Sequence, residues 1–399
     1  MKACSSSELR TLRNTFRESK QHKYLNEVSL VADKESTAMF NVAGMQQLIP
    51  YLMGKPHELG RRVFNIQRCI RTVDIDEVGD ASHLTYFDMM GNWSLGDYFK
   101  KEAVAWSWEF LTSPEYLAID TKKLAVTVFQ GDENAARDEE TAQYWKAAGV
   151  SEDKISYLPA KHNRRSPGPV GPCGPDTEIF YRVGKDSELP PAGSNVESDE
   201  DNWMEIWNNV FMEFYRDESG TLTKLKQQNV DTGMGFERMC KTLQGKETVY
   251  ESDLFMPIIQ EIEQLTGTKY QDHLRRMRIV ADHLRTALRL AEDGLFPSNE
   301  GKGYVMRMII RRMRYNLILI KDISRESAQK FLKHAVIKNE LEQFRKTIAN
   351  GTKMLEEIIQ KSDKIIAGKD IFMLYDTYGF PIELTREIAT EKNISLDEE

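Results

Sequence analysis

Hydrophobic positions follow two different periods along the chain. Up to about residue 240, helical stretches are mixed with stretches in which apolar and polar residues alternate, most clearly TEIFYRVG at 177–184 and MEIWNNVFMEF at 204–214. Such alternation predicts strands, here antiparallel strands with one working face. The segment 184–202 between them is acidic and rich in Pro, Gly and Ser, which predicts a solvated loop. In MEIWNNVFMEF (204–214) we expect Ile206, Asn208, Val210 and Met212 to lie on one face of the strand.

After Gly245 the apolar period changes to about 3.6 residues. Long amphipathic stretches occur around 250–290, 303–322 and 324–366, which predicts a mostly helical second half. We therefore expect an α+β protein with two domains. Residues 1–240 would form an antiparallel β-sheet flanked by helices, and residues 241–399 a mostly α-helical domain.

Length and composition fit a globular protein of this kind. With 399 residues, 40% of them hydrophobic, the chain can fill two or three cores at roughly 150 residues per domain. No window approaches the roughly 20 apolar residues of a membrane span, and the N-terminal MKACSSSELR lacks the apolar block of a signal peptide. We expect a cytoplasmic protein without a membrane partner.

Charge and cysteine spacing narrow the range of ligands. The net charge of -8 argues against a general binder of DNA or RNA, so any nucleic-acid contact must come from local basic patches. The cysteines lie far apart and form no set with histidine at zinc spacing, so we expect neither zinc nor a disulfide framework. They are Cys4, Cys69, Cys173 and Cys240.

The stretch NVDTGMGFERM at 229–239 combines glycines with charges. A dinucleotide-binding GxGxxG fingerprint fails because Arg238 occupies the third glycine position, so a nicotinamide-dependent dehydrogenase is disfavoured. Gly233 and Gly235 would instead let a substrate lie against the backbone at a strand end. Asp231 would supply a fixed negative charge, and Arg238, in the first helical turn, a positive charge for phosphate. The alternative is a strand-to-helix turn with a solvated aspartate and arginine.

The stretch 64–103 predicts a strand, a loop, a second strand and a helix capped near Asp97. Arg71 ends the first of these strands. Its guanidinium could clamp an α-phosphate and a carboxylate together and stabilise the charge that develops during adenylate formation. Taken alone, an arginine such as Arg71 is more often a surface ion-pair residue.

Six blocks in order resemble one family. They are AGM (43–45), RCIR (68–71), FDMMGNWSLGDYFK (87–100), GPCGPDTEIFY (171–181), EIWNNVFMEF (205–214) and DTGMGFER (231–238). Together they are similar to the alanyl-tRNA synthetases, which belong to the class II aminoacyl-tRNA synthetases, and they include the motifs 2 and 3 of that class. The resemblance runs from about residue 8 to the C-terminus. It implies the class II antiparallel sheet, adenylation of alanine by ATP, and transfer of alanyl to the 3' end of tRNA(Ala).

The resemblance also implies roles for single residues. Arg71 would hold the ATP α-phosphate and the alanine carboxylate, and Arg238 the γ-phosphate, with Gly235 at the ATP site. Magnesium would arrive with ATP, and Glu178 would help to hold it, although a structural ion pair is an alternative role for Glu178.

For alanine, the resemblance implies that Asp231 binds the ammonium group, with Gly233 close behind. Asn208 and Val210 would line the pocket from one strand face, as their alternation allows. Val210 would leave room for little more than a methyl group. Such a pocket cannot reject glycine or serine strongly, because a methyl group is worth only about 1 to 3 kcal/mol.

The stretch PSNEGKGYVMRMIIRRMRYN at 297–316 predicts a turn and then a helix. Apolar residues at 306, 309, 310 and 313 fall on one face and arginines on another. A solvated basic face is one interpretation, but the stretch resembles the family's acceptor-stem recognition segment. The arginines that would bind tRNA are Arg307, Arg311 and Arg314.

Two further positions match residues that approach the G·U pair of the tRNA acceptor stem in that family. They are Asn299 and Asp376, whose oxygens suit the guanine amino group as acceptors. A helix or turn cap is the alternative role for Asp376. Further phosphate contacts are expected from Arg275, Arg276, Arg285 and Arg289.

Three features depart from the family pattern. The loop TVDIDEVGD at 72–80 is several residues shorter than usual and lacks a lysine, and Arg165 stands where a tryptophan is common. None of the seven histidines forms an HxxxH or CxxxH set, so editing in cis is expected to be absent. A synthetase-like paralogue, which binds RNA or adenylates an amino acid without productive tRNA charging, is therefore the alternative function.

Overall fold

The chain forms two compact units in the computed structural model. The structure describes residues 1–397 except 33–37, 167, 169, 185–188, 192, 325, 328–330, 333, 363 and 379. At residues 346 and 383 it describes the backbone but not the side chain. Unit 1 comprises Met1–Ala32, Phe40–Ile75 and Asp80–Pro257. Unit 2 comprises Asp76–Gly79, Ile258 onwards and the short stretch 38–39. Helix α6 crosses the boundary expected at 240/241, because it spans Phe236–Leu243.

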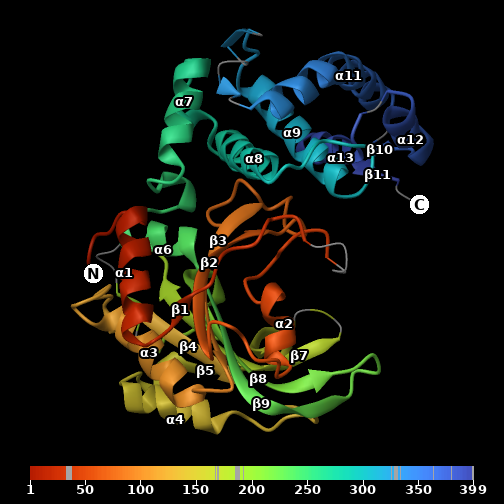
Figure 1. Ribbon diagram of the computed structural model, residues 1–399. Coiled ribbons are helices and arrows are strands. Elements are labelled where there is room, and N and C mark those ends of the chain that lie inside the picture. The colour runs from red at the N-terminus through yellow and green to blue at the C-terminus, as the bar shows by residue number, and fades with distance from the viewer. Residues whose placement is uncertain are drawn as a thin grey trace. The chain divides into compact units, whose positions relative to one another are not determined.

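Unit 1 is built on one nine-stranded sheet of order β1-β2-β3-β9-β8-β7-β4-β5, with β6 paired to β7 (Figure 1). The strands from β2 to β4 along this path are antiparallel, and only the outer pairs β1·β2 and β4·β5 are parallel. The strand bounds are β1 Lys23–Tyr24, β2 Arg62–Ile70, β3 Tyr86–Leu95, β4 Leu124–Phe129, β5 Ile155–Leu158, β6 Arg164–Arg165, β7 Gly171–Arg182, β8 Trp203–Arg216 and β9 Leu222–Gly235.

Helices cover one face of this sheet. Apolar residues of α1, α3 and α4 form a single buried core with one face of the strands, and the shorter α2 lies on the other side (Figure 1). A capping box between Ser5 and Glu8 begins α1. The helix bounds in unit 1 are α1 Ser6–Ser19, α2 Ile49–Leu52, α3 Lys100–Thr112, α4 Glu139–Ala148, α5 Ala160–Asn163 and α6 Phe236–Leu243.

The prediction that the helix is capped near Asp97 is wrong. Helix α3 follows Phe99 and has no side-chain cap, whereas Asp97 forms an ion pair with Arg62 at 3.0 Å. Asp97 is engaged by the neighbouring strand, so its carboxylate is directed to a guanidinium and not to the first turn of the helix.

The prediction that Ile206, Asn208 and Val210 share one face of the strand is wrong for Ile206. The register between β7 and β8 shifts by one residue, since Ile179 pairs with Trp207 but Phe180 pairs with Glu205. Ile206 is the extra residue, and it packs into the helix-covered core, whereas Val210 and Met212 lie in a core on the other face. A β-bulge of this kind reverses the alternation on its two sides.

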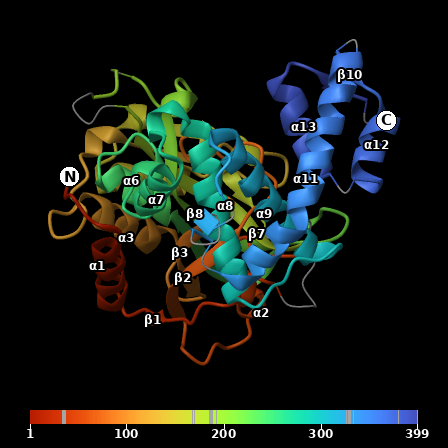
Figure 2. The same ribbon diagram turned by 90° about the horizontal axis from the view of Figure 1, so that it is seen from above.

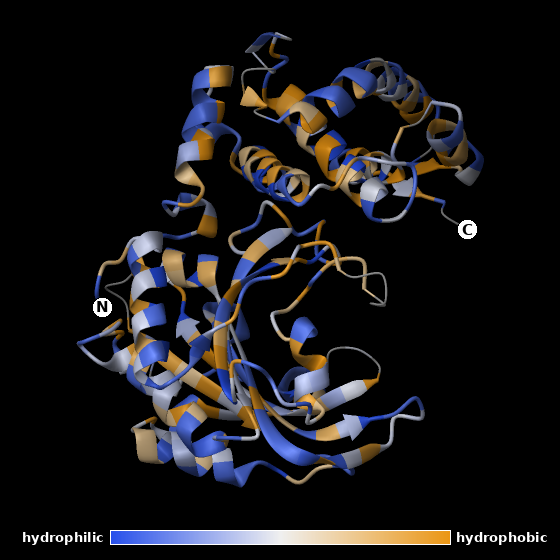
Figure 3. Ribbon diagram, in the orientation of Figure 1, coloured by the Kyte–Doolittle hydropathy of each residue, from blue (hydrophilic) through white to orange (hydrophobic). Residues whose placement is uncertain are grey.

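Unit 2 is mostly helical, which confirms the predicted α+β architecture. Its helices carry both hydrophobic and hydrophilic residues (Figure 3), and α11, α12 and α13 gather around one apolar core (Figure 2). The bounds are α7 Met256–Thr266, α8 Leu274–Glu292, α9 Gly301–Ile320, α11 Ala335–Lys361, α12 Gly368–Asp376 and α13 Ile382–Glu391, with a small parallel sheet of β10 Ile365–Ile366 and β11 Ser395–Leu396. Across the residues that the structure describes, no helix has the length and apolar character to cross a membrane.

Candidate active site

Neighbouring strands place the predicted alanine-binding residues next to one another. Trp93 on β3 pairs with Asp231 on β9, which pairs with Val210 on β8. Two residues along the strands, in the next row on the same face, Gly91 pairs with Gly233, which pairs with Asn208. Directly paired residues of an antiparallel sheet project to the same face, so these two rows form adjoining parts of one surface. It is the face opposite α1, α3 and α4.

Asp231 is a partly buried acid whose hydrogen-bond donor, Trp93, is uncharged. The indole Nε1 of Trp93 donates a hydrogen bond to Asp231 Oδ1 at 2.5 Å. Burial raises the pKa of Asp231 to about 7, and the hydrogen bond from Trp93 opposes this rise. Among the residues that the structure describes, no lysine or arginine forms an ion pair with Asp231. A cationic ligand group would therefore be the natural partner of this carboxylate.

Two glycines beside Asp231 let neighbouring side chains lie against the sheet. A Cβ atom at Gly91 would lie 2.2 Å from Cη2 of the Trp93 ring, and a Cβ atom at Gly233 would lie 2.9 Å from Met89 Sδ. The Trp93 ring therefore lies over Gly91. Gly233 has no side chain of its own, and the flexible Met89 side chain lies over it.

The two predicted phosphate-binding arginines lie on the same face, further along it. A Cβ atom at Gly235 would lie 3.4 Å from Arg238 Cδ, so the Arg238 side chain covers that glycine. Arg238 also donates from Nη1 to the Glu205 carbonyl oxygen at 2.9 Å. The Arg71 guanidinium lies 5.1 Å from the centroid of the Phe87 ring.

Along β3 this face presents, in order, Trp93 beside Asp231, Met89 beside Gly235, and Phe87 beneath Arg71. From residue 93 to residue 87 the strand spans roughly 20 Å. The face therefore runs from an acid at one end to guanidinium groups at the other, which suits an elongated ligand with a cationic and an anionic end. The individual roles of these residues stay predictions.

Asn208 lies beside two carboxylates of β7. Its Nδ2 donates to Asp176 Oδ2 at 2.6 Å and to Glu178 Oε1 at 3.1 Å. Arg165 forms an ion pair with Glu178 at 2.5 Å. The structure thus contains the ion pair that was the alternative role for Glu178, while its role towards magnesium stays a prediction. Burial raises the pKa of Glu178 to about 7 and that of Asp176 well above its usual range.

Sequence reasoning missed three residues of this face, namely Trp93, Met89 and Asp176. All three occur within the blocks that carry the family resemblance, and alternation along 87–95 would have placed Met89, Gly91 and Trp93 on one side. Alternation does not reveal which strand lies next to which. The contact between Trp93 and Asp231, 138 positions apart, was therefore beyond it.

In unit 2 the arginines of α9 are engaged in ion pairs. Arg307 and Arg311 lie 3.3 and 2.9 Å from the same oxygen of Glu340 on α11, and Arg314 lies 3.5 Å from Asp322. Arg307 also donates to Asn299 Oδ1. The apolar face of α9 is buried as expected, with Met306, Ile309, Ile310 and Met313 inside.

The other predicted tRNA-facing residues occupy different settings. Asn299 is exposed just before α9, and Asp376 is exposed at the C-terminal end of α12. Arg275 donates to the carbonyl oxygen of Asp76 at 2.9 Å, and Arg276 pairs with Glu391 at 3.0 Å. Arg289 forms a surface pair with Glu292, and Arg285 has contacts of its own.

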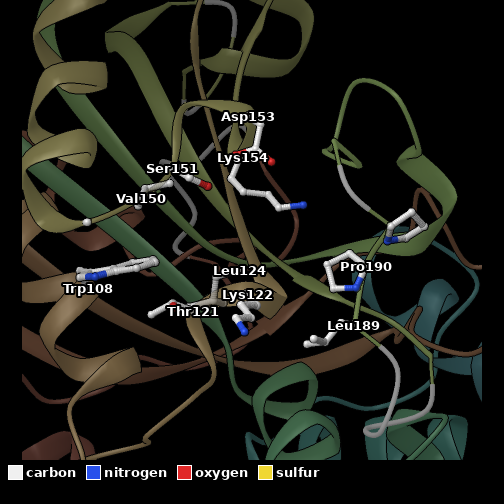
Figure 4. A pocket seen from close by; sticks show the side chains of 12 residues that line it. Trp108, Thr121, Lys122, Leu124, Val150, Ser151, Asp153, Lys154, Leu189 and Pro190 are labelled. Carbon is white, nitrogen blue, oxygen red and sulfur yellow. The ribbon is translucent and has the colours of Figure 1, made fainter.

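A pocket of about 340 Å³ occurs elsewhere in unit 1 (Figure 4). It contains none of the predicted site residues, and its Trp108 belongs to the helix-covered core, which is on the other side of the sheet. It is thus separate from the candidate site. Its lining residues are Trp108, Thr121, Lys122, Leu124, Gly149, Val150, Ser151, Asp153, Lys154, Leu189, Pro190 and Pro191.

Comparison with known proteins identifies the family. Residues 9–399 match the family model described as tRNA synthetases class II (A). The chain is 46% identical to an alanine–tRNA ligase of Borrelia hermsii and 44% identical to one of Treponema denticola, covering 98% of this chain and 70% of each relative. An alanine–tRNA ligase of Thermotoga maritima is 42% identical over the whole chain and 48% of its own length. Among solved structures, apo histidyl-tRNA synthetase of S. aureus covers 65% of this chain and 75% of its own at 10% identity, with a TM-score of 0.35. The resemblance found in the sequence is confirmed: the chain belongs to the alanine–tRNA ligase family of class II tRNA synthetases.

Proposed function

We propose that the chain activates alanine with ATP and transfers the alanyl group to the 3' end of tRNA(Ala). In the first step the alanine carboxylate attacks the α-phosphorus of ATP, alanyl-adenylate forms and pyrophosphate leaves. Such a reaction depends on positioning and on charge stabilisation. A face with an acid at one end and two guanidinium groups towards the other supplies both.

The observation that carries the proposal is the setting of Asp231. The carboxylate lies beside Gly233, over which the flexible Met89 side chain lies, with Val210 as its direct neighbour in the sheet. An ammonium group can pair with the carboxylate while the small α-substituent faces Val210. The charge of the ligand also suits the residue, since the ammonium ion favours the ionised form of Asp231.

For ATP, we propose that Arg71 holds the α-phosphate and the alanine carboxylate and Arg238 the γ-phosphate, with Gly235, which the Arg238 side chain covers, at the same site. Magnesium prefers hard oxygen ligands and often binds through substrate phosphates together with one or two carboxylates. The carboxylates of Glu178 and Glu205 fit this chemistry, although each also faces an arginine. We therefore expect the ATP phosphates to hold most of the ion, with these carboxylates in support.

For tRNA, we propose that Asn299 and Asp376 approach the G·U pair of the acceptor stem. Both are exposed, and the neighbours of Asp376 on α12, Phe372 and Tyr375, are exposed as well. Arg307 would act partly by orienting Asn299, because it donates to Asn299 Oδ1. The absence of editing within these 399 residues and the cytoplasmic location stay predictions.

Alanine-dependent exchange of pyrophosphate into ATP tests the first step. The assay is run with alanine, serine and glycine, and alanine is expected to give the highest kcat/KM. A folded sample without alanine-dependent exchange would refute the proposal.

Charging of tRNA, with and without the G·U pair, tests the second step. Loss of charging on replacing the pair is expected. Exchange without any charging would favour the paralogue that adenylates an amino acid without productive transfer.

A further inference from the structure

A buried polar cluster joins three helices within unit 2. On α9, Arg312 donates from Nε to Oε2 of Glu387 on α13 at 3.0 Å, and Asn316 donates from Nδ2 to Oε1 of the same carboxylate at 3.3 Å. On α8, Nε2 of His283 lies 3.1 Å from Arg312 Nη1, and Nδ1 of His283 lies 2.8 Å from Asp282 Oδ2. The side chain of Arg312 is 5% exposed and that of Glu387 is 12% exposed. We call these residues the polar cluster.

Hydrogen-bond chemistry assigns each member of the polar cluster one role. A guanidinium only donates, so Nε2 of His283 accepts from Arg312, and the ring proton is on Nδ1, which donates to Asp282. Burial lowers the pKa of His283, which favours the neutral ring that this role requires. The polar cluster is therefore fully satisfied only when α13 presents Glu387 to Arg312.

The ion pair fixes α13 against α9 more strictly than apolar packing does. A shift of α13 by one helical turn, about 5.4 Å, would leave the buried charges of Arg312 and Glu387 unpaired, at a large cost in free energy. The apolar contact of α9 with the core around α11, α12 and α13 is made by Tyr315, and such contacts are non-directional. The polar cluster thus selects one arrangement of these helices.

The polar cluster also joins the segments that carry the residues proposed to read the G·U pair. Asn299 lies just before α9, and Arg307 of α9 donates to its Oδ1. Asp376 is the last residue of α12, and the turn that leads to α13 is held to α12 by a hydrogen bond from Phe380 N to the Leu374 carbonyl oxygen at 2.8 Å. Helices α12 and α13 share one buried core as well. The position of Asp376 therefore follows α13, and that of Asn299 follows α9.

We propose that Arg312 and Glu387 are positioning residues, which set the spacing of Asn299 and Asp376 and thereby make tRNA charging depend on the G·U pair. This inference rests on the proposed recognition of that pair by Asn299 and Asp376. Hydrogen bonds weaken steeply when their distance or angle departs from the ideal, so two readers on separate elements need a fixed spacing. Arg312 and Glu387 act through the helices and need not touch the RNA, because both are largely buried.

The test compares the charging of two tRNA(Ala) transcripts. One has the G·U pair, and the other has inosine in place of that guanine, which removes only the exocyclic amino group. The discrimination ratio is kcat/KM for the guanine transcript divided by kcat/KM for the inosine transcript. Thermal unfolding and alanine-dependent exchange without tRNA are measured for every variant.

Three variants break the ion pair. They are Arg312→Met, Glu387→Gln, and the double variant that combines Arg312→Met with Glu387→Leu. The double variant replaces both charges by apolar side chains, which can restore stability. Leu290→Ala is the control, because Leu290 is a fully buried residue of α8 outside the polar cluster and its truncation leaves a cavity.

In every folded variant of the ion pair the discrimination ratio is expected to fall about tenfold, the value of one hydrogen bond to a charged group, mainly through slower charging of the guanine transcript. Alanine-dependent exchange should stay close to that of the unaltered chain, since the residues proposed for it lie in unit 1. The double variant should regain thermal stability without regaining the ratio. Leu290→Ala should lose stability and keep the ratio.

An unchanged ratio in the folded double variant would overturn the inference. A ratio that falls together with thermal stability in every variant, Leu290→Ala included, would also overturn it, because the ion pair would then act through stability alone. Failure of the proposed function looks different. In that case the unaltered chain itself charges neither transcript, or charges both equally well.

Discussion

In unit 2 the buried carboxylate of Glu340 lies between two arginines, whereas in unit 1 the partly buried carboxylate of Asp231 has an indole N–H as its hydrogen-bond donor. A second acid of unit 2, Glu387, is likewise 3.0 Å from Arg312. These two acids of the helical unit are thus neutralised by the chain itself. Asp231 is not, and its raised pKa records that difference.

The difference separates acids that hold the fold together from an acid that we propose is kept for a ligand. Removing one partner of a buried ion pair leaves the other charge uncompensated and destabilises the fold. Removing an acid that has no cationic partner can leave stability unchanged or improve it, at the expense of binding. Each prediction below tests this contrast.

The largest effect is expected for Asp231→Asn. Truncating one member of a desolvated charge pair costs several kcal/mol, so kcat/KM for alanine should fall about a thousandfold. The free energy of unfolding in urea should stay the same or rise, because a poorly compensated acid is removed. If the variant kept exchange activity near that of the unaltered chain, or lost much of its stability, Asp231 would not be an acid that serves binding in place of stability.

The opposite outcome is expected for Glu340→Gln. The side chains of Arg307 and Arg311 are only 18% and 15% exposed, so loss of their shared counter-charge should lower the free energy of unfolding by about 3 kcal/mol. Alanine-dependent exchange should change little if alanine binds in unit 1. Glu292→Gln, which breaks the exposed pair with Arg289, is the control and should leave stability nearly unchanged.

A smaller effect is expected for Gly91→Ala. The new Cβ would overlap the Trp93 ring, which must move and would weaken its hydrogen bond to Asp231. Overpacking should cost about 2 kcal/mol of stability and lower exchange as well. Gly233→Ala meets the flexible end of Met89 instead, so it should raise the KM for alanine with less loss of stability. Equal stability losses in the two variants would argue against a fixed Trp93.

The smallest effect is a dependence on pH. Since the ammonium group needs an ionised Asp231, kcat/KM for alanine should rise between pH 6 and 8 with a midpoint near 7. The contribution of Asp231 to the free energy of unfolding changes with pH in the opposite direction. The folded state keeps the proton of Asp231 up to a pH at which the unfolded chain has lost it, so this group's contribution to stability falls as the pH rises from about 4 to 7. Asp231→Asn should remove the Asp231 part of both trends.

The alternation of 177–184 and 204–214 and the motif at 229–239 were enough to predict the strands β7, β8 and β9, and the change of period at Gly245 was enough to predict the helical part. Local pattern carries this information because a strand or helix with the wrong period could not bury its apolar side. Pairings across the sheet were not predictable in the same way. The contacts Arg165–Glu178, Trp93–Asp231 and Arg311–Glu340 join separate elements, and the local pattern around each residue does not reveal which residue of another element it meets.

The extra residue at Ile206 decides which side of the sheet Glu205 faces. Downstream of the bulge, even-numbered positions such as Asn208 lie on the face of the candidate site, while upstream of it the odd-numbered Glu205 lies on that face and meets Arg238. Deletion of Ile206 would remove the bulge but leave Glu205 opposite Phe180 and on the same side. A regular strand with all the residues of β8 would instead turn Glu205 to the helix side and away from Arg238, so the contact that we propose to place Arg238 for the triphosphate depends on the bulge more than on which apolar residue forms it.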